Sequence, residues 1–168
     1  MVNAPPIEVR AWDPVNVPMI RHYCEAVGIE NPLYVDEAEA RKGPHGAIVA
    51  PASMLYDWTM PGYTGRSPGG DCREPGREVA ACMAREGFPD VVAVRLQHEY
   101  YRYPRVGERL TRLASIAAIG SVKKTALGEG RFISEDNVFV NETGERVGRA
   151  VISFLCYKPA GRPVETSI

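Results

Sequence analysis

The order of its local patterns most constrains how this chain can fold: helices and loops come first, and long strand-like segments follow. In the second half apolar residues alternate with polar ones, clearly at Val138 and Val140, and turn residues separate the segments. Helices followed by consecutive antiparallel strands are typical of the α+β class. We expect the strands at Val91–Arg102, Arg109–Ser121, Arg131–Val140 and Arg146–Tyr157, with a short opening strand at Ile7–Ala11.

Two turns support this division into strands. Asn141–Gly144 has the composition of a hairpin turn, and Pro104–Gly107 marks a second turn between strands. Each turn lies between two segments with the alternation of a strand. We therefore expect neighbouring strands to run antiparallel.

Helical patterns dominate the first half. Pro18–Val27 has apolar residues at helical spacing and ends at a glycine, and Asp36 can cap a short helix that continues through Arg41. The apolar segment Ile48–Trp58 predicts a buried helix that begins near Pro51. A long sheet must cover one face, so we expect it to wrap around this short central helix.

A loop is expected at residues 61–76, because this stretch holds five glycines and three prolines in sixteen residues. Such a long loop is either functional or a solvated insertion. In the first case it is a mobile lid or channel wall. A short helix is expected to follow at Arg77–Glu86.

Composition indicates a single domain at residues 1–168, and the net charge of −1 gives no reason to expect a nucleic acid or an anionic membrane as partner. No apolar run approaches the roughly 20 residues that span a bilayer. The four cysteines include no C-x-x-C pair, so we expect reduced thiols and no metal site. These features favour a cytoplasmic protein.

Two motifs carry a resemblance that covers most of the chain. Residues 26–55 resemble the signature of MaoC-like, R-specific enoyl-CoA hydratases, which runs roughly G-D-x-N-P-L-H, D-x-x-x-A and I-V-H-G-M-L. Residues 103–110 are similar to the family's P-V-x-V-G-D-x-L turn. The variant I-V-A-P at residues 48–51 is typical of the N-terminal dehydratase subfamily related to fatty-acid synthase. The resemblance implies a hot-dog fold, a long antiparallel sheet around a short central helix.

The family's catalytic positions are replaced in this chain. In active members the Asp and His of the first motif hold the water that adds to the double bond, and this chemistry needs groups that exchange protons near neutral pH. Ile29 stands at the Asp position and Tyr34 at the His position. Pro51 stands at the glycine whose backbone N–H binds the thioester oxygen, unless the register shifts by one to Ala52. We therefore expect no catalytic residue in this chain.

The resemblance implies an acyl-CoA substrate and no cofactor besides the coenzyme A thioester itself. Arg105, with Arg102 and Arg109, either meets the phosphates of coenzyme A or belongs to a solvated surface. The substrate-binding residues expected from the resemblance are Asn31, Pro32, Tyr34, Ala52, Tyr56 and Arg105.

A silent hot-dog domain needs a catalytic partner, because the family's active site lies where two hot dogs meet. The resemblance is strongest to the silent subunit of the actinobacterial steroid side-chain hydratase. It implies a heterodimer, or a dimer of heterodimers, with a catalytic MaoC-like subunit on a separate chain, acting on a 2-enoyl-CoA with a bulky acyl group. Two alternatives stay open: an acyl-CoA-binding or scaffolding module without turnover, and a thioesterase that uses Asp57 or Glu30.

Overall fold

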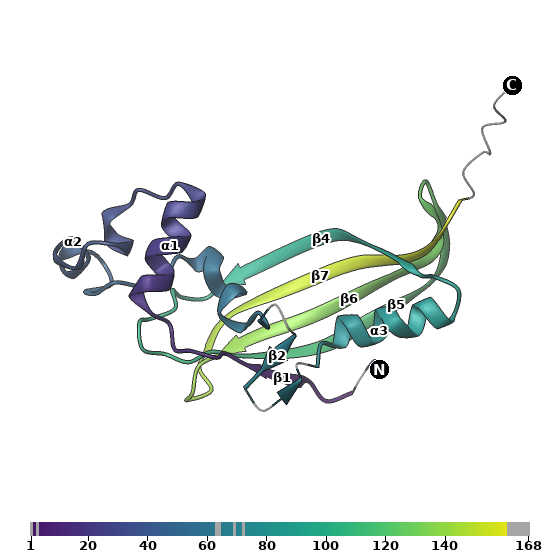
Figure 1. The fold of residues 1–168 in the computed structure, drawn as a ribbon, viewed down its shortest axis with the longest axis horizontal. Helices are drawn as coiled ribbons and strands as arrows, with labels where there is room; N and C mark the ends of the chain where they lie inside the picture. The colour runs from purple at the N-terminus through teal and green to yellow at the C-terminus, as the bar shows by residue number, and fades with distance from the viewer. Residues whose placement is uncertain (1, 3, 63–64, 69, 72, 161–168) are drawn as a thin grey trace, which may run out of the picture.

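A computed structural model describes residues 2, 4–62, 65–68, 70–71 and 73–160 of the chain. Its main feature is a five-stranded antiparallel sheet in the order β1-β5-β6-β7-β4 (Figure 1). The strands are β1 (Ile7–Arg10), β4 (Asp90–Tyr100), β5 (Thr111–Thr125), β6 (Gly128–Val140) and β7 (Arg146–Pro159). The predicted strands are confirmed, with ends that lie up to four residues from the predicted ones, some longer and some shorter. The expected hairpin turn is also present, with Gly144 at a φ of 81°.

Three helices and three 3₁₀ turns complete the main elements of the described chain. The helices are α1 (Val17–Val27), α2 (Glu37–Lys42) and α3 (Pro75–Arg85), and the turns are η1 (Pro32–Tyr34), η2 (Ala52–Leu55) and η3 (Asp57–Thr59). Helices α1 and α2 lie together at one end of the sheet (Figure 1). The predicted cap of α2 is confirmed, because the Asp36 side chain accepts hydrogen bonds from the N–H groups of Ala38 and Glu39.

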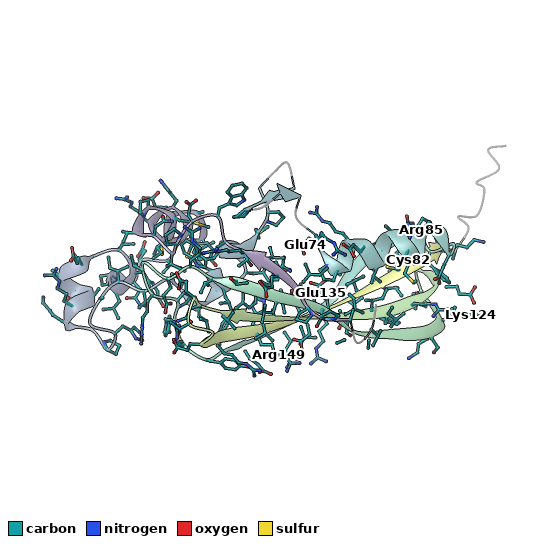
Figure 2. All side chains as sticks on the ribbon, turned by 90° about the horizontal axis from the view of Figure 1, so that it is seen from below. Glu74, Cys82, Arg85, Lys124, Glu135 and Arg149 are labelled. Carbon is teal, nitrogen blue, oxygen red and sulfur yellow. The ribbon has the colours of Figure 1, made fainter. Side chains whose placement is uncertain are left out.

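Two apolar clusters cover different parts of the sheet. One joins α1 and η2 to the end of the sheet near the helices, through residues such as Ile20, Met54 and Phe139. The other joins α3 to the middle and far part of the sheet, through Val79, Met83 and their neighbours on β5, β6 and β7. Of the three helices, α3 is therefore the one that lies along the sheet (Figures 1 and 2).

The predicted helix at Ile48–Trp58 is wrong. The segment forms only η2 and η3, in which backbone bonds span three residues: the N–H of Met54 bonds to Pro51 and that of Thr59 to Tyr56. The Thr59 hydroxyl also donates a hydrogen bond to the Tyr56 carbonyl. A longer helix would need this carbonyl as an acceptor for its own backbone hydrogen bonds. Helix α3 instead takes the position along the sheet, and the α+β hot-dog architecture is confirmed.

The predicted loop at residues 61–76 is only partly irregular. Strands β2 (Arg66–Ser67) and β3 (Gly70–Asp71) form a short antiparallel pair within it, and α3 begins at Pro75, two residues earlier than predicted. Residues 63–64, 69 and 72 lie outside the described residues. The mobility of this segment and its role as a channel wall stay predictions.

No helix in the described part of the chain has the length and apolar character needed to cross a membrane.

Candidate functional site

Ile29 and Tyr34 are the residues that the resemblance aligns with the family's acid–base pair. Both side chains are half-buried and pack against the apolar cluster around α1 and η2. Ile29 follows Gly28, which ends α1 with a φ of 73°, and its N–H donates to the carbonyl of Cys24 at 2.9 Å. The position that would carry a carboxylate is therefore an apolar contact at the end of α1.

Tyr34 cannot replace the missing imidazole. Burial raises the pKa of Tyr34 above its usual 10.0, and the neighbouring Tyr103 raises it further. The two rings lie 6.4 Å apart between centroids. The hydroxyl therefore stays protonated at neutral pH and provides no general base.

Asn31 and Pro32 have a local structural role. The Asn31 side chain caps η1 by accepting a hydrogen bond from the N–H of Leu33 at 3.1 Å, and Pro32 occupies the first position of that turn. Both residues are exposed. They hold the loop that carries Tyr34, and their surface is open to a ligand.

Pro51 and Ala52 are the residues that the resemblance aligns with the family's thioester-binding backbone. Pro51 is buried and has no N–H, and its carbonyl accepts from the N–H of Met54. Ala52 is the first residue of η2, and the first N–H groups of a helical turn have no partner within that turn. A donor at this place can therefore come from Ala52 but not from Pro51.

A cavity of about 580 Å³ opens beside η2. Ala52 and Arg105 both line it, together with Pro44, His45, Val49 and Tyr103. His45 packs on Tyr103 with ring centroids 4.6 Å apart, and Tyr103 also faces Tyr34. Ala52 and Arg105 therefore share a cavity with Tyr103, the neighbour of Tyr34.

Of the three arginines near the turn at residues 104–107, two have structural roles. Arg102 pairs with both Glu108 and Glu145 at 2.8 Å, and Arg109 donates to the carbonyl of Ala11 at 3.0 Å. The Arg105 guanidinium is exposed and has no partner among the described residues. It is therefore the arginine of this group that is available for a phosphate.

Tyr56 lies away from that cavity, although it follows Ala52 by only four residues. Its hydroxyl accepts a hydrogen bond at 3.0 Å from the buried Arg112, which also donates to the Asn137 side chain at 2.9 Å. Arg112 further pairs with Glu74, and its Nη1 lies 3.6 Å from a carboxylate oxygen of Glu135. We refer to Tyr56, Glu74, Arg112, Glu135 and Asn137 as the buried polar cluster.

Burial shapes the titration of this cluster. It is the largest influence on Glu135 and raises the pKa of that carboxyl, while the charge of Arg112 and the backbone of Gly76 offset part of the rise. In Figure 2 the labelled Glu74 and Glu135 lie at the end of α3 nearest the middle of the molecule.

Sequence reasoning did not find the buried polar cluster. A signal was present, since Arg112 lies between the apolar Leu110 and Ala114 at alternating positions of a predicted strand, and Glu135 follows Ile133 in the same manner. Charged residues at positions that face the core are rare unless they are paired. The pairing itself could not be seen from the sequence.

The two carboxylates considered for a thioesterase differ in their surroundings. Asp57 is half-buried, and burial raises the pKa of its carboxyl, while His98 lowers it in part. Glu30 is exposed on the loop after α1. Among the described residues, no three His, Cys, Asp or Glu side chains gather to hold a metal ion.

Comparisons with known proteins identify relatives along nearly the whole chain. The family described as FAS1-like, dehydratase domain region, matches residues 9–150. A probable enoyl-CoA hydratase alpha subunit of Thermomonospora curvata is 39% identical over 150 residues, which cover 89% of this chain and 47% of the relative. The 3-oxo-4,17-pregnadiene-20-carboxyl-CoA hydratase alpha subunit of Mycobacterium tuberculosis is 40% identical over 154 residues, 91% of this chain and 48% of that protein. The chain thus spans about half the length of these relatives.

Solved structures give the same result. A chain of the ChsH1-ChsH2 complex from Mycobacterium tuberculosis superposes with a TM-score of 0.85 and 38% identity, covering 95% of this chain and 88% of that one. The (R)-hydratase of A. caviae, at 12% identity and a TM-score of 0.61, covers 93% of this chain and 97% of its own and shows the shared fold alone. By its family match over residues 9–150, this chain belongs to the FAS1-like dehydratase domain family.

Proposed function

We propose that this chain is the non-catalytic subunit of a heteromeric enoyl-CoA hydratase. In this assembly a partner hot-dog subunit supplies the Asp/His pair that adds water to the double bond, and this chain supplies the acyl-binding channel. The observation that carries the proposal is that Ile29 and Tyr34, which the resemblance aligns with the acid–base pair, pack against the apolar cluster, where Ile29 has no ionisable group and the pKa of the Tyr34 hydroxyl is raised.

The substrate we propose is a 2-enoyl-CoA with a bulky acyl group, a steroid side-chain thioester. The name of the Mycobacterium tuberculosis relative supports this class of substrate. The sheet face beside α3 supports it as well, because Ile152, which lines the groove there, is only half-buried. Addition of water to a polarised double bond is acid–base chemistry, so the reaction needs no cofactor besides the coenzyme A thioester.

The contacts we propose for this chain fall in two places. Beside η2, the Ala52 N–H faces the thioester, and the Arg105 guanidinium meets a phosphate of coenzyme A, for which its fork of donors is well suited. Tyr56 lies with the acyl group in the interior. The proposed substrate-binding residues are therefore Asn31, Pro32, Tyr34, Ala52, Tyr56 and Arg105.

The partner we propose is a catalytic MaoC-like subunit that pairs with β4. This strand is at the edge of the sheet and is bonded only to β7 along its length. An exposed edge presents unpaired N–H and C=O groups to another strand. The unpaired cysteines Cys24, Cys82 and Cys156 agree with a place in the reducing cytoplasm, where both subunits would meet their thioester.

The test uses the chain alone, a MaoC-like partner encoded beside it alone, and the mixture of the two. Hydration of a steroid 2-enoyl-CoA is measured by the loss of enoyl-thioester absorbance. We expect turnover in the mixture and none from this chain alone, and we expect a partner variant without its Asp/His pair to abolish the activity of the mixture. Steady hydration by the isolated chain would contradict the proposal.

The same experiment separates the alternatives. Release of free coenzyme A by the isolated chain would identify a thioesterase, and substitution of Asp57 by Asn should then abolish the release. Binding of acyl-CoA without turnover in any mixture would identify a binding or scaffolding module.

A further inference from the structure

A groove of about 420 Å³ runs between α3 and the sheet, and its walls differ in character from its inner end. The walls are apolar and are formed by Ala80 of α3 with Val91, Ala93, Ile152 and Phe154 of the sheet. The polar side chains that line it are Tyr56, Glu74 and Glu135 of the buried polar cluster and Arg77 of α3. The volume lies in the range of pockets that hold small organic ligands.

Among the described residues, no group accepts a hydrogen bond from the Tyr56 hydroxyl, so its hydrogen has no partner there. Its oxygen accepts the hydrogen bond from Arg112 Nη1, and the same guanidinium lies 4.9 Å from the centroid of the Tyr56 ring. Since Tyr56 lines the groove, the hydrogen is available to a ligand in it.

The Tyr56 hydroxyl is protonated at neutral pH. Burial raises the pKa of Tyr56 to about 12, against the opposing charge of Arg112. A protonated phenol that accepts from a cation is polarised and donates a stronger hydrogen bond than a free one.

We propose that Tyr56, oriented by Arg112, donates a hydrogen bond to a neutral oxygen, a ring ketone or hydroxyl, at the far end of the acyl group that lies in this groove. This inference rests on the proposed function, because it assigns the groove to the acyl part of the substrate. It adds a recognition site for the end of the substrate remote from the thioester.

The charges around the groove select the class of ligand group. Glu74 and Glu135 line the groove beside Tyr56, so an anionic group placed against the Tyr56 hydroxyl would meet repulsion from these carboxylates. Apart from Arg77 of α3, the walls are formed by apolar side chains, which offer no partners to a strongly hydrated group. A ring system that is apolar except for one oxygen meets both requirements.

The Tyr56 site and the proposed thioester contacts lie in different cavities. Ala52 and Arg105 line the cavity beside η2, whereas Tyr56 lines the groove under α3, and the two sets of lining residues share no member. A substrate that reaches both sites must be long and rigid enough to present its oxygen to Tyr56. A short straight acyl chain would leave Tyr56 without a partner.

The experiment measures binding, so that it does not depend on turnover. The probes are two saturated steroid-20-carboxyl thioesters of coenzyme A, one with a ring ketone at the far end and one with a methylene in its place. Their Kd values are measured by isothermal titration calorimetry on the complex of this chain with its catalytic partner. The variants are Tyr56→Phe and, as matched control, Tyr157→Phe, which lies in β7 outside the residues that line the groove.

We expect Tyr56→Phe to weaken binding of the ketone probe by about tenfold and to leave the methylene probe unchanged, as for the loss of one hydrogen bond. Tyr157→Phe should change neither Kd. Equal effects of Tyr56→Phe on both probes, or equal affinity of the native complex for both, would overturn the inference. If the ketone preference holds while the complex hydrates no enoyl-CoA, the inference stands and the hydratase function fails.

Discussion

Gly76 lies directly against the carboxylate of Glu135. Its N–H donates to that carboxylate, and a Cβ at position 76 would overlap Glu135 Oε2. This contact explains a glycine in the first turn of α3, where glycine is unfavourable to the helix by about 1 kcal/mol relative to alanine. The close approach of backbone and carboxylate joins the helix to the buried polar cluster.

Substitution of Gly76 by Ala should therefore destabilise the chain, against the trend of helix propensity. Because Glu135 is held by its buried partners, we expect a loss of about 1–3 kcal/mol in the free energy of unfolding, as for overpacked sites. Urea denaturation gives the value. Gly62→Ala is the control, since a Cβ there meets no atom within 4 Å, and it should change stability by less than about 0.5 kcal/mol. A Gly76→Ala variant more stable than the native chain would refute the contact.

Loss of Arg112 should be much more harmful than loss of an exposed arginine. Arg112→Met leaves the carboxylates of Glu74 and Glu135 buried without their cation, and we expect a loss of about 3–5 kcal/mol. Arg149→Met is the control, because its pair with Asp136 is partly exposed, at 40% and 24%, and contributes under about 1 kcal/mol (Figure 2).

Chemical denaturation of both variants checks this difference. Adding Glu135→Gln to Arg112→Met should recover part of the loss, because it removes the Glu135 charge that Arg112 no longer balances. Similar losses for the Arg112 and Arg149 variants would contradict the buried pairing.

The raised pKa of Glu135 predicts how stability varies with pH. Its proton is bound more tightly in the folded chain than in the unfolded one, so its contribution is full below the ordinary pKa of 4.5 and is lost as the pH rises through the folded pKa. Glu135→Gln should remove this loss, so its free energy of unfolding should rise relative to that of the native chain as the pH increases above 4.5.

Urea denaturation at several pH values between about 4 and 8 measures the two slopes. Asp57→Asn serves as a second variant, because the pKa of Asp57 is raised by burial as well and adds to the native slope. Parallel curves for the native chain and Glu135→Gln would show that this carboxyl does not titrate differently on folding.

Local patterns were sufficient to predict most of the fold. The strands could be predicted because alternation and turn residues are properties of neighbouring positions, and the cap at Asp36 because it acts within three residues. The helix at Ile48–Trp58 failed for a related reason. An apolar run shows that a segment is buried but does not distinguish a long helix from short turns, and here Thr59 and Tyr56 close the turns.

The same distinction between local patterns and distant contacts holds for the candidate site. That Ile29 and Tyr34 replace an acid–base pair stays a prediction, and it could be predicted because both lie inside a motif of fixed spacing. The separation of Ala52 from Tyr56 could not be, since the two residues belong to one short segment and line different cavities. The cluster around Arg112 joins segments far apart in the sequence, and no local pattern contains such pairings.

The prediction for assembly with a catalytic partner rests on the edge strand β4. Val94 and Leu96 are 53% and 61% exposed, a high value for apolar side chains in the middle of a strand. The register shift between Ala93 and Arg95 places Val94 at an irregularity of this edge. A partner strand that pairs with β4 would remove both side chains from water, which is the expected reason for their apolar character.

The double substitution Val94→Glu and Leu96→Glu should therefore weaken assembly with the catalytic partner by about a hundredfold or more, because two charges would be buried at the new contact. The isolated variant should unfold like the native chain, since both positions are exposed there. The matched control is Val122→Glu with Leu127→Glu, at residues 40% and 48% exposed around the β5–β6 connection, and it should leave assembly unchanged. Sedimentation velocity of each variant mixed with the partner measures the complex. If the β4 variant sediments with its partner as the native chain does, the partner does not use this edge.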